Sequence, residues 1–130
     1  MPSPGAYWIF DLHDGRFYRP INFGASYPTY SGSPGHVNNP GYETVAHNGP
    51  IPRGMWRMVD WKRVSNDGNK TNVIVLAPEP GTRAYGRDNF LIHGDNAQMN
   101  QSASKGCIII NGASNRWNIW QSGVRLIRVQ

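Results

Sequence analysis

Short apolar runs separated by glycine- and proline-rich turns constrain the fold of this chain more than any other feature. The 130 residues include 15 glycines and 10 prolines. The runs between them are about four to eight residues long, and they are rich in β-branched and aromatic side chains, as strands are. No internal repeat is present. We therefore expect residues 1–130 to form a single, mostly β domain, either a β-sandwich or a partly open barrel.

The boundaries of the runs place the expected elements. A hairpin is expected where "AYWIFDL" (6–12) and "RFYRPI" (16–21) flank the turn-forming pair Asp14-Gly15. Further strands are expected at "RGMWRMVDWKRV" (53–64), "TNVIVLAP" (71–78), "NFLIH" (89–93), "CIII" (107–110) and "VRLIRV" (124–129). Residues 24–52 read as one long loop. Residues 112–123 read as one short helix, with Ser114 as its N-cap and Gly123 as its end.

Charge and cysteine content limit the classes of function. The formal net charge is +5, but the 13 lysines and arginines are scattered and form no run. We therefore expect no nucleic-acid partner. One cysteine forms no internal disulfide, and no Cys and His pairs have zinc-site spacing, so we expect neither a metal nor a cofactor. The sequence has no secretory signal and no apolar run of about 18 residues, which predicts synthesis in the cytoplasm and no membrane span.

The pairing of His93 with Cys107 is the constellation that carries chemistry. His93 ends one expected strand and Cys107 begins another, so side-by-side pairing of these strands in either direction brings thiol and imidazole close. Imidazole can act as the base that activates a cysteine nucleophile. Gly106 allows a tight turn that aims the N–H groups of Gly106 and Cys107 at an oxyanion. Each residue alone also suits a structural role, since a lone cysteine before "III" is more often core packing.

The motif "IHGD…ASKGCIII" resembles the active-site motif of the L,D-transpeptidase catalytic domain, in which His-Gly is followed after a spacer by Ser-x-Gly-Cys. The closer resemblance is to the type VI secretion L,D-transpeptidase effectors. It includes "YSG" (30–32), "NNPGYE" (38–43), "GPIPRGMW" (49–56) and "GRDNFLIHGDN" (86–96), which follow one another in family order. Many housekeeping members instead carry His before the Gly-Cys pair and Arg two residues after the cysteine. Here these positions are Lys105 and Ile109, which favours hydrolysis over cross-linking.

The resemblance implies an L,D-transpeptidase-like fold and a cysteine enzyme that modifies peptidoglycan. Its cysteine would attack the amide between the third residue of a stem tetrapeptide and the D-Ala at position four. Water would resolve the thioester in L,D-carboxypeptidase action, and a D-amino acid would resolve it in L,D-transpeptidase exchange. The effector resemblance further implies a secreted antibacterial toxin that acts in the periplasm of a target bacterium. Its partners would be peptidoglycan stem peptides, a cognate immunity protein and components of the secretion apparatus.

Five further residues have both a functional and a structural interpretation. Asp95 can orient the imidazole of His93 or cap a turn. Ser104 can bond the histidine or serve as a turn hydroxyl, and Lys105 can hold the thiolate or stay solvated. Arg87 can clasp a stem-peptide carboxylate or remain a surface charge. Tyr30 can form a wall of the substrate cleft or pin its loop to the core.

Two other functions are compatible with the same sequence. The first is a module of the same fold that binds peptidoglycan without turning it over. The second is a small basic nucleic-acid-binding β-barrel, which needs basic and aromatic residues on one face and is disfavoured by the scattered charges. Thiol reactivity separates the enzyme from the binding module, since the alkylation rate of Cys107 should depend on His93 only if the cysteine is catalytic.

Overall fold

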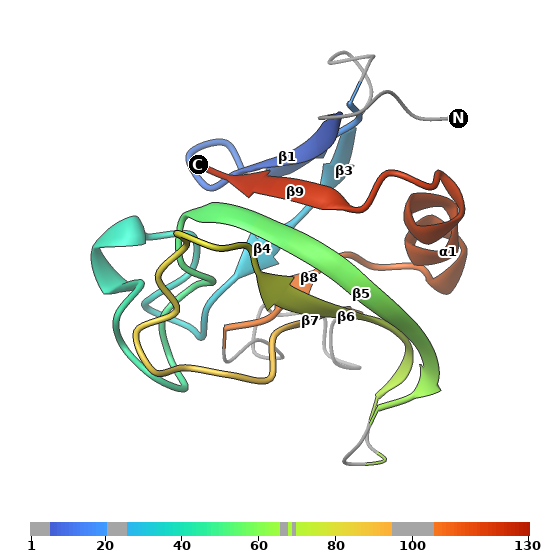
Figure 1. Cartoon of the computed structure of the whole chain (residues 1–130). Helices are drawn as coiled ribbons and strands as arrows, with labels where there is room; N and C mark the ends of the chain where they lie inside the picture. The colour runs from blue at the N-terminus through green and yellow to red at the C-terminus, as the bar shows by residue number, and fades with distance from the viewer. Residues whose placement is uncertain (1–5, 21–25, 66–67, 69, 95–105) are drawn as a thin grey trace.

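The structure is a computed structural model that describes residues 6–20, 26–65, 68, 70–94 and 106–130. Short strands dominate it, and a 3₁₀ helix, η1 (Pro40–Tyr42), and one α-helix, α1 (Ala113–Gln121), accompany them (Figure 1). The strands are β1 (Tyr7–Asp11), β2 (Arg16–Tyr18), β3 (Ser26–Pro28), β4 (Tyr30–Ser31), β5 (Gly54–Val64), β6 (Thr71–Pro78), β7 (Leu91–His93), β8 (Ile108–Ile109) and β9 (Leu126–Val129).

All nine strands of the described residues belong to one sheet, in the order β3-β2-β1-β9-β5-β6-β7-β8-β4. Only Thr29 separates β3 from β4 along the chain, although these two strands are the opposite edges of the sheet. The sheet must therefore curl until its edges nearly meet, which produces a nearly closed barrel. The predicted mostly β fold with a partly open barrel and one short helix is confirmed.

The interior of the barrel is filled by the inward-facing side chains of the strands. Alternate residues of β1 are buried, with Trp8 3% and Phe10 0% exposed. Trp56 of β5 and Ile127 of β9 are fully buried beside them. This alternation is the pattern of a sheet with one face on the core. The helix α1 packs at the edge of this core through Ile119 and contacts β6 (Figure 1).

Two sequence predictions about the fold need correction. The region 24–52 is not one loop, because β3, β4 and η1 lie within it. The helix is capped by Gly112, whose carbonyl accepts from the N–H groups of Asn115 and Arg116, so Ser114 lies inside the first turn. On the same helix, Trp117 is 43% exposed and packs edge-on against Trp61.

Other element predictions are confirmed. The run "TNVIVLAP" is β6 residue for residue, and the hairpin turn at Asp14-Gly15 joins β1 to β2 with Gly15 at φ 68°. Gly123 follows the helix with φ 80°, a left-handed conformation that ends helices. Among the described residues, no helix has both the length and the apolar character needed to span a membrane.

Candidate active site

The pairing of β7 with β8 brings His93 and Cys107 to neighbouring strands. The two strands run parallel, with His93 opposite Ile109. Cys107 directly precedes β8, so the same register puts it level with Leu91. His93 is the last residue of β7, and Cys107 lies directly before the neighbouring strand, two residues before the partner of His93. The pairing of β7 with β8 therefore brings the backbone of the two residues to the same part of the sheet.

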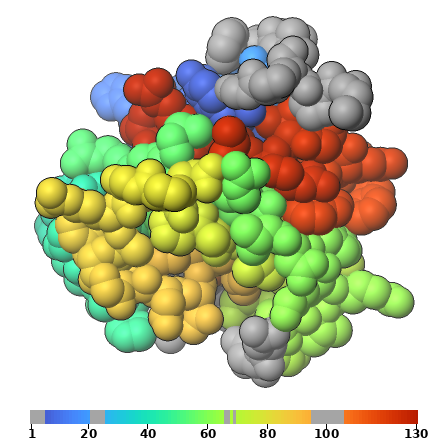
Figure 2. Space-filling model, viewed as in Figure 1, coloured from blue at the N-terminus to red at the C-terminus, as the bar shows by residue number. Residues whose placement is uncertain are grey.

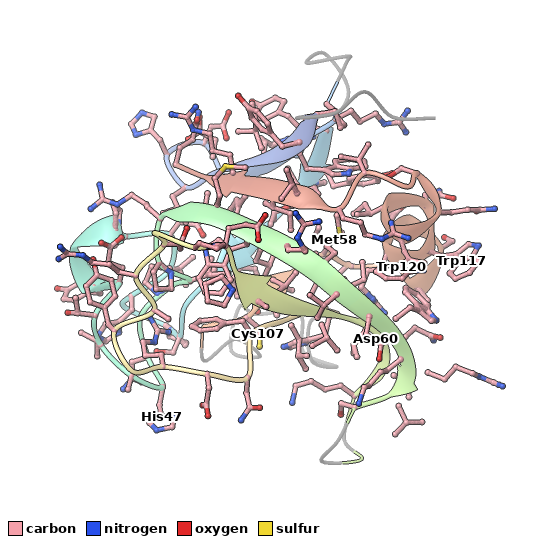
Figure 3. The ribbon with its side chains drawn as sticks, in the orientation of Figure 1. His47, Met58, Asp60, Cys107, Trp117 and Trp120 are labelled. Atoms are coloured by element: carbon pink, nitrogen blue, oxygen red, sulfur yellow. The ribbon has the colours of Figure 1, made fainter. Side chains whose placement is uncertain are left out.

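Cys107 is partly exposed, whereas the three isoleucines that follow it are buried. Figure 3 labels the side chain of Cys107 in the whole molecule. Its Sγ lies 3.5 Å from the main-chain oxygen of Asn89, to which the thiol donates a hydrogen bond. An apolar, enclosed thiol is inert, whereas one that reaches solvent beside polar groups can ionise and react. Cys107 reaches solvent, while its hydrogen bond to the Asn89 carbonyl stabilises the neutral thiol.

His93 is 2% exposed, and its ring orientation is fixed by the backbone. Its Nδ1 lies 2.7 Å from the carbonyl oxygen of Gly94. A carbonyl only accepts hydrogen bonds, so Nδ1 carries the proton in this contact and the lone pair is on Nε2. This tautomer is the one that a general base needs at Nε2. The Gly94 carbonyl thus orients the ring, while Asp95 lies outside the described residues.

Gly106 is required where it stands, directly before Cys107. Its φ is 120°, a conformation that L side chains rarely adopt, and a Cβ there would overlap Nη2 of Arg87. The guanidinium of Arg87 itself donates to three main-chain oxygens, those of Glu43 (2.5 Å), Pro50 (2.8 Å) and Gly49 (2.9 Å). Arg87 therefore joins the 43–50 segment to the peptide that precedes the thiol.

Ser31 supports the same peptide from the other side. Its side chain is fully buried at the end of β4. The hydroxyl donates to the Gly106 carbonyl at 3.3 Å and accepts from the Ile51 N–H at 2.8 Å. Both groups are main-chain atoms at positions distant in sequence, so one hydroxyl links β4, the 49–53 segment and the residue before Cys107.

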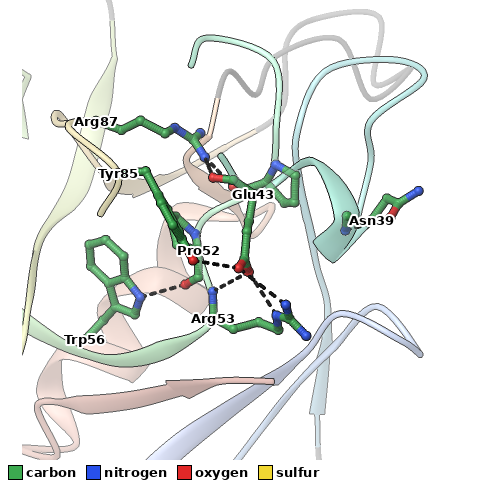
Figure 4. A network of polar contacts seen from close by, with 9 residues as sticks. Asn39, Glu43, Pro52, Arg53, Trp56, Tyr85 and Arg87 are labelled. Carbon is green, nitrogen blue, oxygen red and sulfur yellow. Dashed lines mark hydrogen bonds and ion pairs between the residues drawn. The ribbon is translucent and has the colours of Figure 1, made fainter. Parts of the chain in front are cut away.

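Glu43 is the centre of a polar network next to Arg87 (Figure 4). Its carboxylate accepts from Nε of Arg53 at 2.9 Å and from the hydroxyl of Tyr85 at 3.1 Å. The hydrogen bonds from Arg53 lower the pKa of Glu43, and partial burial of the carboxyl opposes this shift. The network holds the 3₁₀ segment and the 82–87 segment together around Arg87.

The pH dependence of stability should reveal this network. A carboxyl whose pKa is lowered on folding stabilises the fold at neutral pH, and this contribution is lost as pH falls through its folded pKa. We expect Glu43→Gln to cost about 1–2 kcal/mol at pH 7, since its partner Arg53 is half exposed. The deficit should shrink towards zero between about pH 5 and pH 3. Urea unfolding of both proteins across this range measures it, and a deficit that stays constant would contradict the assignment.

Arg116 supports the strand end that carries His93, as Arg87 supports the peptide before Cys107. It is 6% exposed on α1, and it donates to the carbonyls of Asn72 (2.8 Å) and Ile110 (2.7 Å). A Cβ on Gly94 would come within 3.0 Å of its Nη1. The N–H of Ile110 in turn donates to the carbonyl of His93 at 2.9 Å. Arg116 therefore braces the end of β7 that carries the imidazole.

The remaining predicted residues are only partly covered by the structure. Ser104 and Lys105, like Asp95, lie outside the described residues, and their roles stay predictions. Tyr30 is 7% exposed in β4, opposite Ile109. It lines a cavity of about 770 Å³ between the β1–β2 turn, the β3–β4 junction and η1. Neither Cys107 nor His93 lines that cavity, and a role of Tyr30 in the substrate cleft stays a prediction.

Sequence reasoning missed the parts played by Ser31, Glu43 and Arg116. For the first two the signal was present, because the "YSG" and "NNPGYE" motifs contain them.

Figure 2 shows that the loop between β6 and β7, coloured yellow to orange, lies on the surface beside β5. Among the residues that the structure describes, no three His, Cys, Asp or Glu side chains are grouped to hold a metal ion.

Comparison with known proteins supplies two similarities. Residues 25–129 match the Tlde1 domain family. The fold is similar to that in the crystal structure of Mycobacterium tuberculosis L,D-transpeptidase 1, with a TM-score of 0.55 and 15% sequence identity. The match covers 96% of this chain and 60% of that chain, so it spans little more than half of the mycobacterial protein. No curated protein matches this sequence.

Proposed function

Because this chain belongs to the Tlde1 domain family, the type VI secretion L,D-transpeptidase effectors, we propose that it is a cysteine enzyme that trims peptidoglycan stem peptides. The observation that carries this proposal is the parallel pairing of two strands, one ending at a buried histidine whose Nδ1 is held by a main-chain carbonyl and the other preceded by a partly exposed thiol. The whole of residues 1–130 would act as one catalytic domain. The similarity of the fold to an L,D-transpeptidase supports the same substrate class.

In the proposed reaction, Nε2 of His93 accepts the thiol proton and the Cys107 thiolate attacks the carbonyl of the third residue of a stem tetrapeptide. The N–H groups of Gly106 and Cys107 would stabilise the oxyanion. The C–N bond to D-Ala then breaks, and its amine takes the proton from the imidazolium, which leaves a thioester on Cys107. Water releases the tripeptide, or the amine of a D-amino acid replaces D-Ala.

The route of delivery and the biological partners are proposals of the same kind. We propose secretion into a rival bacterium, action in its periplasm and neutralisation by an immunity protein in the producing cell. Family membership supports these proposals. Expression of the chain with and without an export signal in a susceptible bacterium would test the site of action. Lysis or growth arrest only with export is expected.

The activity itself is tested on a purified stem tetrapeptide. Incubation with the protein should release D-Ala, and added D-Met should appear in place of D-Ala if exchange occurs, as measured by mass spectrometry. A tetrapeptide ending in L-Ala is the matched control substrate and should stay intact. Absence of both products with the D-Ala substrate would reject the proposed activity.

A further inference from the structure

Arg87 is built into the candidate site as an anchored charge. Its Nη1 and Nη2 together donate to the main-chain oxygens of Glu43, Pro50 and Gly49. The same guanidinium fills the space that a side chain at position 106 would need. A clasp for a substrate carboxylate needs two nitrogens that face outwards. Both terminal nitrogens of Arg87 are already bonded inside the protein, which favours a different role.

The charge of Arg87 is not neutralised by an adjacent acid. Within the described ranges it makes no ion pair, because the carboxylate of Glu43 bonds to Arg53 and Tyr85. Asp88, the next residue, is exposed. Burial lowers the pKa of Arg87, and the negative charges of Cys107 and Glu43 partly offset this shift. The guanidinium occupies the space next to Gly106, directly before the thiol, and a positive charge at this place favours the thiolate form of Cys107.

The segment that carries Arg87 is held in an unfavourable backbone conformation. Tyr85 and Asn89 have positive φ values of 56° and 59°, which are uncommon for residues other than glycine. Such conformations persist where the surroundings enforce them. Tyr85 is tied to Glu43 through its hydroxyl, and the Asn89 carbonyl is the acceptor for the Cys107 thiol. The strained segment thus contacts the thiol directly and presents Arg87 to the preceding peptide.

We propose that Arg87 is a positioning residue that fixes the Gly106–Cys107 peptide and holds Cys107 partly as thiolate. The inference rests on the proposed function, in which Cys107 is the nucleophile. In this proposal His93 supplies the base, while Arg87 supplies a permanent positive charge next to Gly106, the residue before the thiol. A nucleophile prepared in this way reacts faster near neutral pH, because the thiolate is the reactive form.

The test compares charge with hydrogen bonding at one position. Arg87→Gln keeps donors for the carbonyls but removes the charge, and Arg87→Lys keeps the charge. We expect iodoacetamide at pH 7 to alkylate Cys107 about tenfold more slowly in the glutamine variant. The lysine variant should stay within about threefold of wild type. The release of D-Ala from the tetrapeptide is measured in parallel and should fall with the alkylation rate in the glutamine variant.

Arg125→Gln is the matched control. Arg125 is also half-buried and donates to a main-chain carbonyl, that of Trp120, with its guanidinium 3.6 Å from the Trp120 ring centroid. Cys107 in Arg125→Gln should be alkylated at the wild-type rate. Equal rates in Arg87→Gln and wild type would overturn the inference, as would a parallel fall in Arg125→Gln. If Arg87→Gln does not fold, a tenfold lower alkylation rate of Cys107 in folded Arg87→Lys would overturn the inference. Alkylation needs no peptidoglycan, so failure of the proposed function is seen separately as absent D-Ala release by wild type.

Discussion

Cys107→Ala should abolish the release of D-Ala from stem tetrapeptides, with turnover falling at least about a thousandfold. Alanine has no nucleophile, so no thioester can form. The fold should be little affected, because Cys107 is partly exposed and a 3.5 Å hydrogen bond from a thiol to the Asn89 carbonyl is weak. Mass spectrometry of the peptide products measures the loss.

Cys107→Ser is the matched variant, because it changes a single atom of the side chain. It should also be inactive, since a hydroxyl beside this histidine ionises far less readily than a thiol. Thermal unfolding of both variants should resemble that of wild type. Release of D-Ala by Cys107→Ala at the wild-type rate would show that another group performs the chemistry.

His93→Asn should lower turnover by roughly 10²–10⁴-fold. The asparagine amide can still donate to the Gly94 carbonyl, as Nδ1 of the imidazole does, but it offers no base. The variant therefore removes proton transfer while it keeps the local hydrogen bond. Initial rates of D-Ala release measure the effect, and circular dichroism confirms the fold.

Alkylation of Cys107 in His93→Asn separates the enzyme from a binding module. An activated thiol should react more slowly once its base is removed. Binding of the tetrapeptide without turnover, together with an alkylation rate that is the same in His93→Asn and wild type, would favour a non-catalytic peptidoglycan-binding module. Wild-type turnover in His93→Asn would exclude His93 as the base.

The long strands were predictable because their apolar runs leave little alternative. Residues 71–78 of β6 combine β-branched side chains with a proline at the end, and the strand has the predicted bounds. β3 and β4 were missed because they are only three and two residues long. Their strand conformation depends on partners distant in sequence, such as the pairing of Tyr30 with Ile109. No local pattern encodes such pairing.

The candidate site was predictable at its centre and not at its supports. Strand-end placement and neighbouring glycines pointed to His93 and Cys107, and β7, which ends at His93, pairs with β8, which begins directly after Cys107. The parallel register of those strands had no sequence signal. Ser31 acts on a carbonyl 75 residues away, and Arg87 on one 44 residues away. Such contacts follow from the closure of the barrel, so they become visible only in three dimensions.

The central claim is that Cys107 forms a thioester with the substrate, and mass spectrometry of the acid-quenched, digested protein tests this most directly. Wild type is mixed with the tetrapeptide, quenched in acid within seconds and digested. We expect a tripeptide adduct on the peptide that contains Cys107, and no adduct in Cys107→Ala. Release of D-Ala by wild type while Cys107 stays unmodified and open to alkylation throughout would contradict the account.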